Sequence, residues 1–242
     1  MQRPGWYIDE FAHAGEEHLD PEYVATYDRK SQTDPSDDLA LLQELGMNSE
    51  SVLVDLGAGT GTFALAAAPH CGRVVAVDVS PAMLDYVSTQ AAALGLPNVE
   101  VVRAGLLTYE HKGEPADFIY MRNVLHHLPD FWKGLALQRM ADMLRPDGVL
   151  RLHDLVYSFD PDEVEQFFEP WFAHAAARPE DGWTKEEYET HVRTEYSTYS
   201  WLLEAILERV GFEIDDVSHR PAGVYSAYTC VKRGRVGFPP VH

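Results

Sequence analysis

The sequence has few cysteines and no long apolar run. Its two cysteines, Cys71 and Cys230, are too few for a disulfide framework, and we expect both to be reduced thiols. No stretch approaches the roughly 20 apolar residues that span a bilayer. Residues 1–19 contain four acidic residues in place of the apolar core of a signal peptide. These absences predict a cytoplasmic protein that does not use the membrane.

Positive charge is also scarce. The chain has 19 Lys and Arg residues against 39 Asp and Glu residues, which gives a formal net charge of −20. The electrostatic potential of so acidic a protein repels phosphate backbones, and no cluster of basic residues along the chain offsets this repulsion. We therefore expect neither DNA nor bulk RNA as a partner, and no anionic membrane surface. An acidic balance says little else, because it usually reflects solvated surface.

The remaining composition is that of a globular α/β protein. With 242 residues, 45% of them hydrophobic, the chain fits one large domain. Short apolar runs alternate with helix signals, which is typical of a parallel sheet covered on both faces. The pattern predicts strands at 52–56, 73–77, 99–102, 118–121 and 149–155, and helices at 38–45, 60–68, 81–95 and 130–144.

This alternation breaks after residue 155. Asp160 with Glu163, and Thr184 with Glu187, have the spacing of capping boxes that begin helices. The first of these helices is predicted to run to about 177. A further helix from about 198 to 210 and two strands, 212–217 and 225–231, complete the chain. We therefore predict an N-terminal segment over 1–37, and a domain over 38–242 with a helical insertion over 160–197.

A glycine-rich loop is the most informative motif. Gly57, Gly59 and Gly61 follow the first strand and precede a helix, where glycines let the backbone turn tightly and approach a ligand. Asp78 ends the second strand, in the place where an acidic residue accepts hydrogen bonds from ribose hydroxyls. A dinucleotide fingerprint would need its third glycine at Thr62. The loop therefore favours a nucleoside without a pyrophosphate.

Four blocks in this order resemble the class I S-adenosylmethionine-dependent methyltransferases. They are residues 55–61, 77–84, 117–129 and 144–150, and the resemblance covers roughly 41–155. It implies a Rossmann-like, doubly wound, mostly parallel seven-stranded α/β sheet with a reversed last strand. It also implies S-adenosylmethionine as the cofactor.

The resemblance assigns parts of the cofactor to particular residues. The glycine loop would pass under the methionine part, and Asp78 would hold the ribose. The implied binding residues are Asp55, Gly57, Ala58, Gly59, Asp78, Val79, Met83, Gly105, Leu106, Arg122 and Asn123. Separately from the resemblance, Tyr7 and Tyr27 of the N-terminal segment either close over the cofactor or simply pack on the domain, and we count Tyr27 among the candidate binding residues. The family often has Gly-Asp after the third strand, where this chain has Ala104-Gly105. No side chain there can accept from the adenine amino group, so we expect recognition by backbone or packing.

Methyl transfer from a sulfonium makes few demands on catalytic residues. The enzyme mainly positions the acceptor, and a base is needed only if the acceptor must lose a proton. His127 and His153 lie beyond the fourth strand and at the end of the fifth, where doubly wound folds bind ligands. Each is a candidate base, although a structural role is the favoured interpretation of the His126-His127 turn. No residues have a recognisable metal-ligand framework, so we predict no metal.

The predicted insertion is rich in aromatic residues. These either form a lid over an apolar acceptor pocket or simply pack the helices onto the domain. We predict a methyltransferase acting on oxygen, nitrogen or carbon of a small, partly apolar molecule. A protein or structured-RNA methyltransferase and a non-catalytic cofactor-binding protein remain as alternatives. The sequence leaves the acceptor and the oligomeric state open.

Overall fold

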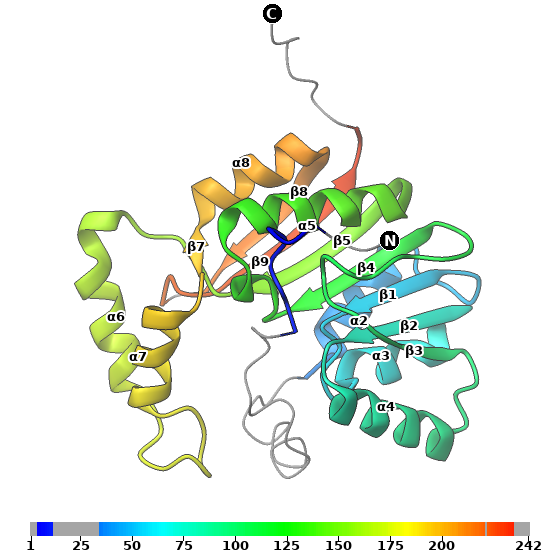
Figure 1. Cartoon of the computed structure of the whole chain (residues 1–242), viewed down its shortest axis with the longest axis horizontal. Helices are drawn as coiled ribbons and strands as arrows, with labels where there is room; N and C mark the ends of the chain where they lie inside the picture. Colours follow the sequence, from blue (N-terminus) through cyan, green and yellow to red (C-terminus); the bar gives the residue numbers. More distant parts are fainter. Residues whose placement is uncertain (1–3, 12–33, 221, 235–242) are drawn as a thin grey trace, which may run out of the picture.

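The computed structural model describes residues 4–11, 34–220 and 222–234. Its centre is a seven-stranded sheet in the order β3-β2-β1-β4-β5-β9-β8 (Figure 1). Strands β1 to β5 are mutually parallel, whereas β9 runs antiparallel to both β5 and β8. This confirms the predicted fold class with its reversed last strand. The strands are β1 (Val52–Leu56), β2 (Arg73–Asp78), β3 (Val99–Arg103), β4 (Ala116–Arg122), β5 (Leu144–Asp154), β8 (Phe212–His219) and β9 (Ser226–Lys232).

Helices cover both faces of this sheet. One face packs against α5 and α8, and the other against α2, α3 and part of α4 (Figure 1). The helices are α2 (Ser36–Glu44), α3 (Thr62–Ala67), α4 (Pro81–Leu94), α5 (Asp130–Met143) and α8 (Ser200–Val210). No helix within the described ranges is long and apolar enough to cross a membrane.

Alternate residues of each central strand face opposite layers. On β1, Leu53 joins the core under α2 and α3, whereas Val54 joins the core under α5 and α8. Val74 and Val75 on β2 divide in the same way. This period of two is inherent in a pleated strand, and burial on both faces explains why the strands read as continuous apolar runs.

The insertion stands beside the sheet rather than on it (Figure 1). It holds η4 (Pro161–Glu163), α6 (Val164–Ala173) and α7 (Lys185–Thr194), and both predicted capping boxes are present. The helix expected to reach residue 177 ends at Ala173. The two-stranded pairing of β6 (Val156–Tyr157) with β7 (Thr198–Tyr199) was not predicted. Because β7 occupies residues 198 and 199, α8 begins at Ser200 and not at about 198.

A buried ion cluster ties α2 to the sheet. Asp38 Oδ1 accepts hydrogen bonds from Arg151 Nε at 2.9 Å and His153 Nε2 at 2.8 Å, and Tyr120 donates to Oδ2 at 3.1 Å. Burial opposes ionisation of Asp38, but His153 and Arg151 outweigh it and hold the pKa of this carboxyl well below its usual range. Helix α2 is therefore held by charge as well as by apolar packing.

Removing one member of this cluster should be costly. We expect Asp38→Ala to lower the free energy of unfolding at pH 7 by about 3 kcal/mol, because Arg151 is left as a buried, uncompensated charge. The exposed neighbour Asp37 provides the matched control, and Asp37→Ala should stay within about 0.5 kcal/mol of wild type. Because folding lowers the pKa of Asp38, its contribution is present above about pH 4 and is lost at lower pH. Urea unfolding from pH 3 to 7 measures this, and equal losses in both variants would contradict the assignment.

Candidate functional site

The glycine loop between β1 and α3 forms one wall of the site. The backbone N–H groups of Gly57 and Ala58 both donate to the carbonyl of Val77, at 2.8 and 3.0 Å. Gly57 has a φ of +73°, and a Cβ atom at this position would lie 2.2 Å from Val124 Cγ2. Position 57 therefore requires glycine for two reasons: the backbone is left-handed there, and it approaches the chain after β4 too closely for a side chain.

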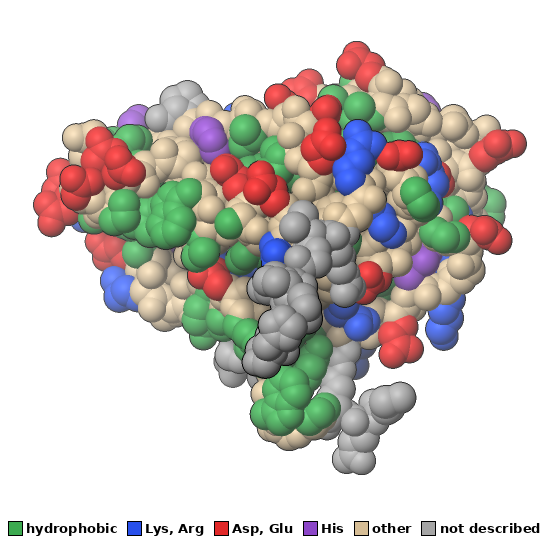
Figure 2. Space-filling view, turned by 90° about the horizontal axis from the view of Figure 1, so that it is seen from above, with side chains coloured by type: hydrophobic (Ala, Val, Ile, Leu, Met, Phe, Trp, Pro, Cys, Tyr) green, Lys and Arg blue, Asp and Glu red, His purple; other side chains and the backbone are tan. Residues whose placement is uncertain are grey.

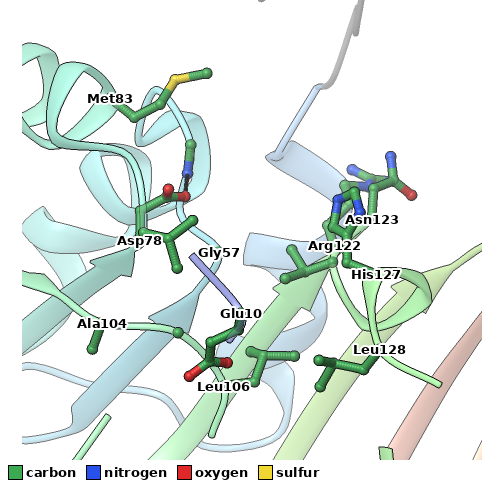
Figure 3. Close-up of a pocket in the computed structure, with 14 residues that line it drawn as sticks. Glu10, Gly57, Asp78, Met83, Ala104, Leu106, Arg122, Asn123, His127 and Leu128 are labelled. Atoms are coloured by element: carbon green, nitrogen blue, oxygen red, sulfur yellow. Dashed lines mark hydrogen bonds between the residues drawn. The ribbon is translucent and has the colours of Figure 1, made fainter. Parts of the chain in front are cut away.

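Asp78 fixes the opposite side of the loop. Its Oδ2 accepts from the backbone N–H of Gly59 at 2.9 Å, and its Oδ1 accepts from the N–H of Ser80 at 2.8 Å (Figure 3). Ser80 in turn caps α4 by accepting from the N–H of Met83 at 3.2 Å. The carboxylate at the end of β2 is thus held between the glycine loop and the first turn of α4.

These elements enclose a pocket at the carboxyl edge of the parallel strands. Its empty volume is about 770 Å³ when the open space at its mouth is included. Figure 3 shows Asp78 and Met83 on one side, and Arg122, Asn123 and His127 on the other. The lining residues are Glu10, Gly57, Gly59, Asp78, Val79, Met83, Ala104, Gly105, Leu106, Arg122, Asn123, Val124, His127 and Leu128.

The pocket gathers most of the predicted site residues, but three of them do not line it. They are Asp55, Ala58 and His153. Tyr27 lies outside the described residues. His153 falls on the α2 face of β5, where its Nε2 is bound to Asp38, because strand residues alternate between faces. The structure therefore does not bring this candidate base to the pocket.

Asp55 lies below the loop and is only 2% exposed. Burial raises its pKa to about 7, with the nearby charge of Asp78 acting in the same direction against a hydrogen bond from the backbone of Ala64. A carboxyl group that is partly protonated near neutral pH is compatible with this buried position.

The turn after β4 contains two histidines in different environments. His126, in η3 (Leu125–His127), is buried between two carboxylates: its Nδ1 lies 2.5 Å from Asp154 Oδ1, and its Nε2 lies 3.0 Å from Glu195 Oε2. Burial disfavours the charged ring, but Asp154 and Glu195 outweigh it and raise the pKa of His126 to about 9. At neutral pH the charged His126 ring is therefore hydrogen-bonded to Asp154 and forms an ion pair with Glu195, which joins the sheet to the end of the insertion. This is the structural role favoured from the sequence.

His127 has a different position. It lines the pocket, its side chain is 28% exposed, and its Nδ1 lies 3.8 Å from Glu195 Oε2. Ligand atoms of His126, His127 and Glu195 lie within 4.8 Å of one another, close enough to consider a metal. In this structure the cluster is an ion pair between His126 and Glu195 with a neighbouring imidazole, that of His127.

Glu10 is the site residue that sequence reasoning missed. It is 7% exposed, lines the pocket, and accepts a hydrogen bond from the backbone N–H of Leu107 at 2.9 Å through Oε2. The expectation that only backbone and packing are available next to Gly105 is therefore corrected. No local pattern marks Glu10, because it reaches the pocket across 97 positions of sequence.

The His126 ion pair makes stability depend on pH. Folding raises the pKa of His126 from 6.5 to about 9, so its contribution is fully present below about pH 6.5 and is lost as the pH rises through 9. We expect the stability difference between wild type and His126→Asn to shrink by about 2–3 kcal/mol from pH 6.5 to 9.5. His174→Asn, at an exposed site after α6, is the control. Denaturant unfolding at both pH values gives the result, and an unchanged difference would contradict it.

The close approach of Gly57 predicts a second pair of variants. Gly95 has a similar φ of +68°, but no atom lies within 4 Å of a Cβ placed there. We expect Gly95→Ala to cost about 1 kcal/mol from backbone strain alone, and Gly57→Ala to cost at least 2 kcal/mol because Val124 must also move. Chemical denaturation measures both. Equal losses would show that the loop does not press on Val124.

Comparison with known proteins agrees with this geometry. The family described as "Methyltransferase domain" matches residues 53–148, which include β1 to β4 and the glycine loop. An uncharacterized methyltransferase, YcgJ of Bacillus subtilis, is 30% identical over 113 residues, covering 47% of this chain and 44% of that relative. Trans-aconitate 2-methyltransferase of Methylobacterium radiotolerans is 34% identical over 112 residues, covering 46% and 40%. The chain thus matches less than half the length of both relatives.

A solved structure extends the likeness to the whole fold. Magnesium protoporphyrin IX methyltransferase (ChlM) from Synechocystis PCC 6803 with bound SAH superimposes with a TM-score of 0.63 at 13% identity, covering 93% of this chain and 100% of that one. At that identity the likeness supports the fold alone. Together with the sheet order and the glycine loop with Asp78, these comparisons lead to one conclusion: residues 53–148 match a methyltransferase domain, and the chain has the fold of the class I S-adenosylmethionine-dependent methyltransferases.

Proposed function

We propose that this protein transfers the methyl group of S-adenosylmethionine to a small, partly apolar acceptor. The observation that carries the proposal is Asp78, held by Gly59 and Ser80 in a pocket at the carboxyl edge of the parallel strands. A carboxylate in this place accepts from the vicinal hydroxyls of a ribose. We further propose that the protein works in the cytoplasm, a reducing compartment that suits its two free, buried cysteines.

The described residues fit S-adenosylmethionine. Gly57 and Gly59 line the pocket without side chains, so the backbone of the loop itself faces the space that the cofactor would fill. Val79 and Met83 would contact the adenine, and Arg122 and Asn123 the methionine end. Asn123 has a φ of +55°, an uncommon backbone for a non-glycine residue and one that often occurs at functional sites. When bound, the sulfonium supplies the activated methyl group.

The chain's own residues would then position and shield the acceptor. Displacement at a methyl group needs the acceptor atom in line and little water nearby. His127 lines the pocket on the side of the insertion and is the candidate to take a proton from an acceptor hydroxyl or amine. A neutral amine already carries a lone pair and needs no base before the transfer, whereas a hydroxyl or carbon acceptor must lose a proton, so this role depends on the acceptor atom.

Surface charge supports a small acceptor over a nucleic acid. In Figure 2 acidic side chains occur across the face shown, and the lysines and arginines are scattered among them without forming one basic patch. A phosphate backbone would bind such a surface poorly. An aromatic cluster of β6 and the insertion, which includes Tyr157 and Trp171, reaches the His126 turn through His191, whose ring packs edge-on against Trp171 and His126. Many of these aromatic side chains pack against one another. We propose that the insertion also contributes to binding the acceptor.

Calorimetric titration of S-adenosylmethionine and S-adenosylhomocysteine tests the proposal. We expect wild type to bind both, and Asp78→Ala to bind at least about tenfold more weakly, because the ribose loses a charged acceptor and the glycine loop loses its anchor. Asp85→Ala, at an exposed position of α4, is the matched control and should bind as wild type does.

Two results would contradict the proposal. Folded wild type that binds neither compound would exclude the cofactor, and equal affinity in Asp78→Ala would exclude the assigned ribose contact. If the protein binds the cofactor but forms no methylated product across a broad screen of small acceptors, the alternatives become a protein or structured-RNA substrate, or a non-catalytic role.

A further inference from the structure

We propose that Glu10 recognises the 6-amino group of adenine and makes the site selective for 6-aminopurine nucleosides. The inference deepens the proposed function and rests on it. Its starting point is a carboxylate at one end of the pocket, delivered by a segment far from the rest of the site in sequence (Figure 3).

One oxygen of Glu10 has a partner and the other does not. Oε2 accepts from the backbone N–H of Leu107, whereas Oε1 is buried and has no hydrogen-bond partner among the described residues. A buried carboxylate oxygen without a donor is unfavourable, so Oε1 needs a donor from water, an ion or a ligand in the pocket. The unpaired oxygen therefore calls for a donor from whatever fills the pocket.

Gly105 shows how closely the carboxylate fits this end of the pocket. A Cβ atom built on Gly105 would lie 2.3 Å from Glu10 Cδ and 2.4 Å from Oε2. The carboxylate therefore occupies the space that a side chain at position 105 would use. An acidic side chain at 105 is unnecessary here because Glu10 brings the same chemical group to the same place.

The surroundings suit a flat base with an exocyclic donor. Val79, Met83 and Leu106 provide apolar surface in the same pocket, and Asp78 lies further along it (Figure 3). A purine between these apolar groups, with its ribose at Asp78, directs its outer edge toward the end that holds Glu10. An amino group on that edge can donate to Oε1, whereas a carbonyl there would face a second acceptor.

The segment that carries Glu10 is held on both sides. Tyr7 packs edge-on against Trp132 of α5 with ring centroids 4.8 Å apart, and Trp6 stacks on the same ring at 6.1 Å. On the other side, the guanidinium of Arg103 lies 5.5 Å from the ring centre of Phe11. These contacts set the position of Glu10 without using its carboxylate, as a recognition residue requires.

Two demethylated product analogues test this assignment by binding alone. S-adenosylhomocysteine carries a 6-amino group, and S-inosylhomocysteine carries a 6-oxo group in its place. By isothermal titration of the full chain, we expect wild type to bind the amino compound at least about tenfold more tightly, since the oxo compound leaves Oε1 unpaired and facing another acceptor.

The variant Glu10→Gln should reverse or abolish this preference. The N–H of Leu107 requires the amide oxygen of Gln in the place of Oε2, so the amide NH₂ takes the place of Oε1 and presents a donor to the base. Glu208→Gln, exposed on α8, is the control and should keep the wild-type preference. If Glu10→Gln does not fold, Glu10→Asp replaces it; its shorter carboxylate withdraws from the base, and the preference should fall to about threefold or less.

The outcomes separate this inference from the proposed function. Wild type that binds neither compound would overturn the proposed function. Wild type that binds both with equal affinity, or a folded Glu10 variant that keeps the full preference for the amino compound, would overturn the role of Glu10 and leave the cofactor assignment intact.

Discussion

The close approach of the glycine loop to the chain after β4 is the constraint on which the rest of the site depends. Gly57 has no space for a side chain because Val124 fills it, and Asp78 holds Gly59 from the other side. The loop is therefore confined between two neighbouring strands of the parallel sheet. That confinement opens a pocket at the carboxyl edge and leaves the Asp78 carboxylate at its rim. Loss of the contact between Gly57 and Val124, or of the one between Gly59 and Asp78, would change the position of the loop and the shape of the pocket.

The pleat of the strands then decides which polar residues reach this pocket. Residues of β5 on the α2 side form the ion cluster with Asp38. The side chain of His153 therefore lies away from the pocket and stabilises α2. At the strand end, Asp154 binds His126 and the backbone N–H groups of the turn. With His126 fixed in this way, its neighbour His127 is the histidine presented to the pocket.

Much of this arrangement could be predicted from the sequence, because its signals are local. Apolar runs with glycines at their ends predicted the parallel sheet, and the spacing from Gly57 to Asp78 predicted the nucleoside pocket. Glu10 and Asp38 could not be found in this way. Their partners lie 97 and 113 positions away in sequence, and an acid near the start of a helix or in an N-terminal segment is usually solvated. Only the packing of the α2 layer and of residues 4–11 reveals that both are buried.

A crystal structure of the protein with S-adenosylhomocysteine would test the assigned site most directly. We expect ribose hydroxyls on Asp78, the homocysteine part beside the glycine loop at Gly57, and the adenine amino group on Oε1 of Glu10. A ligand bound elsewhere, or a ribose that makes no contact with Asp78, would contradict this assignment.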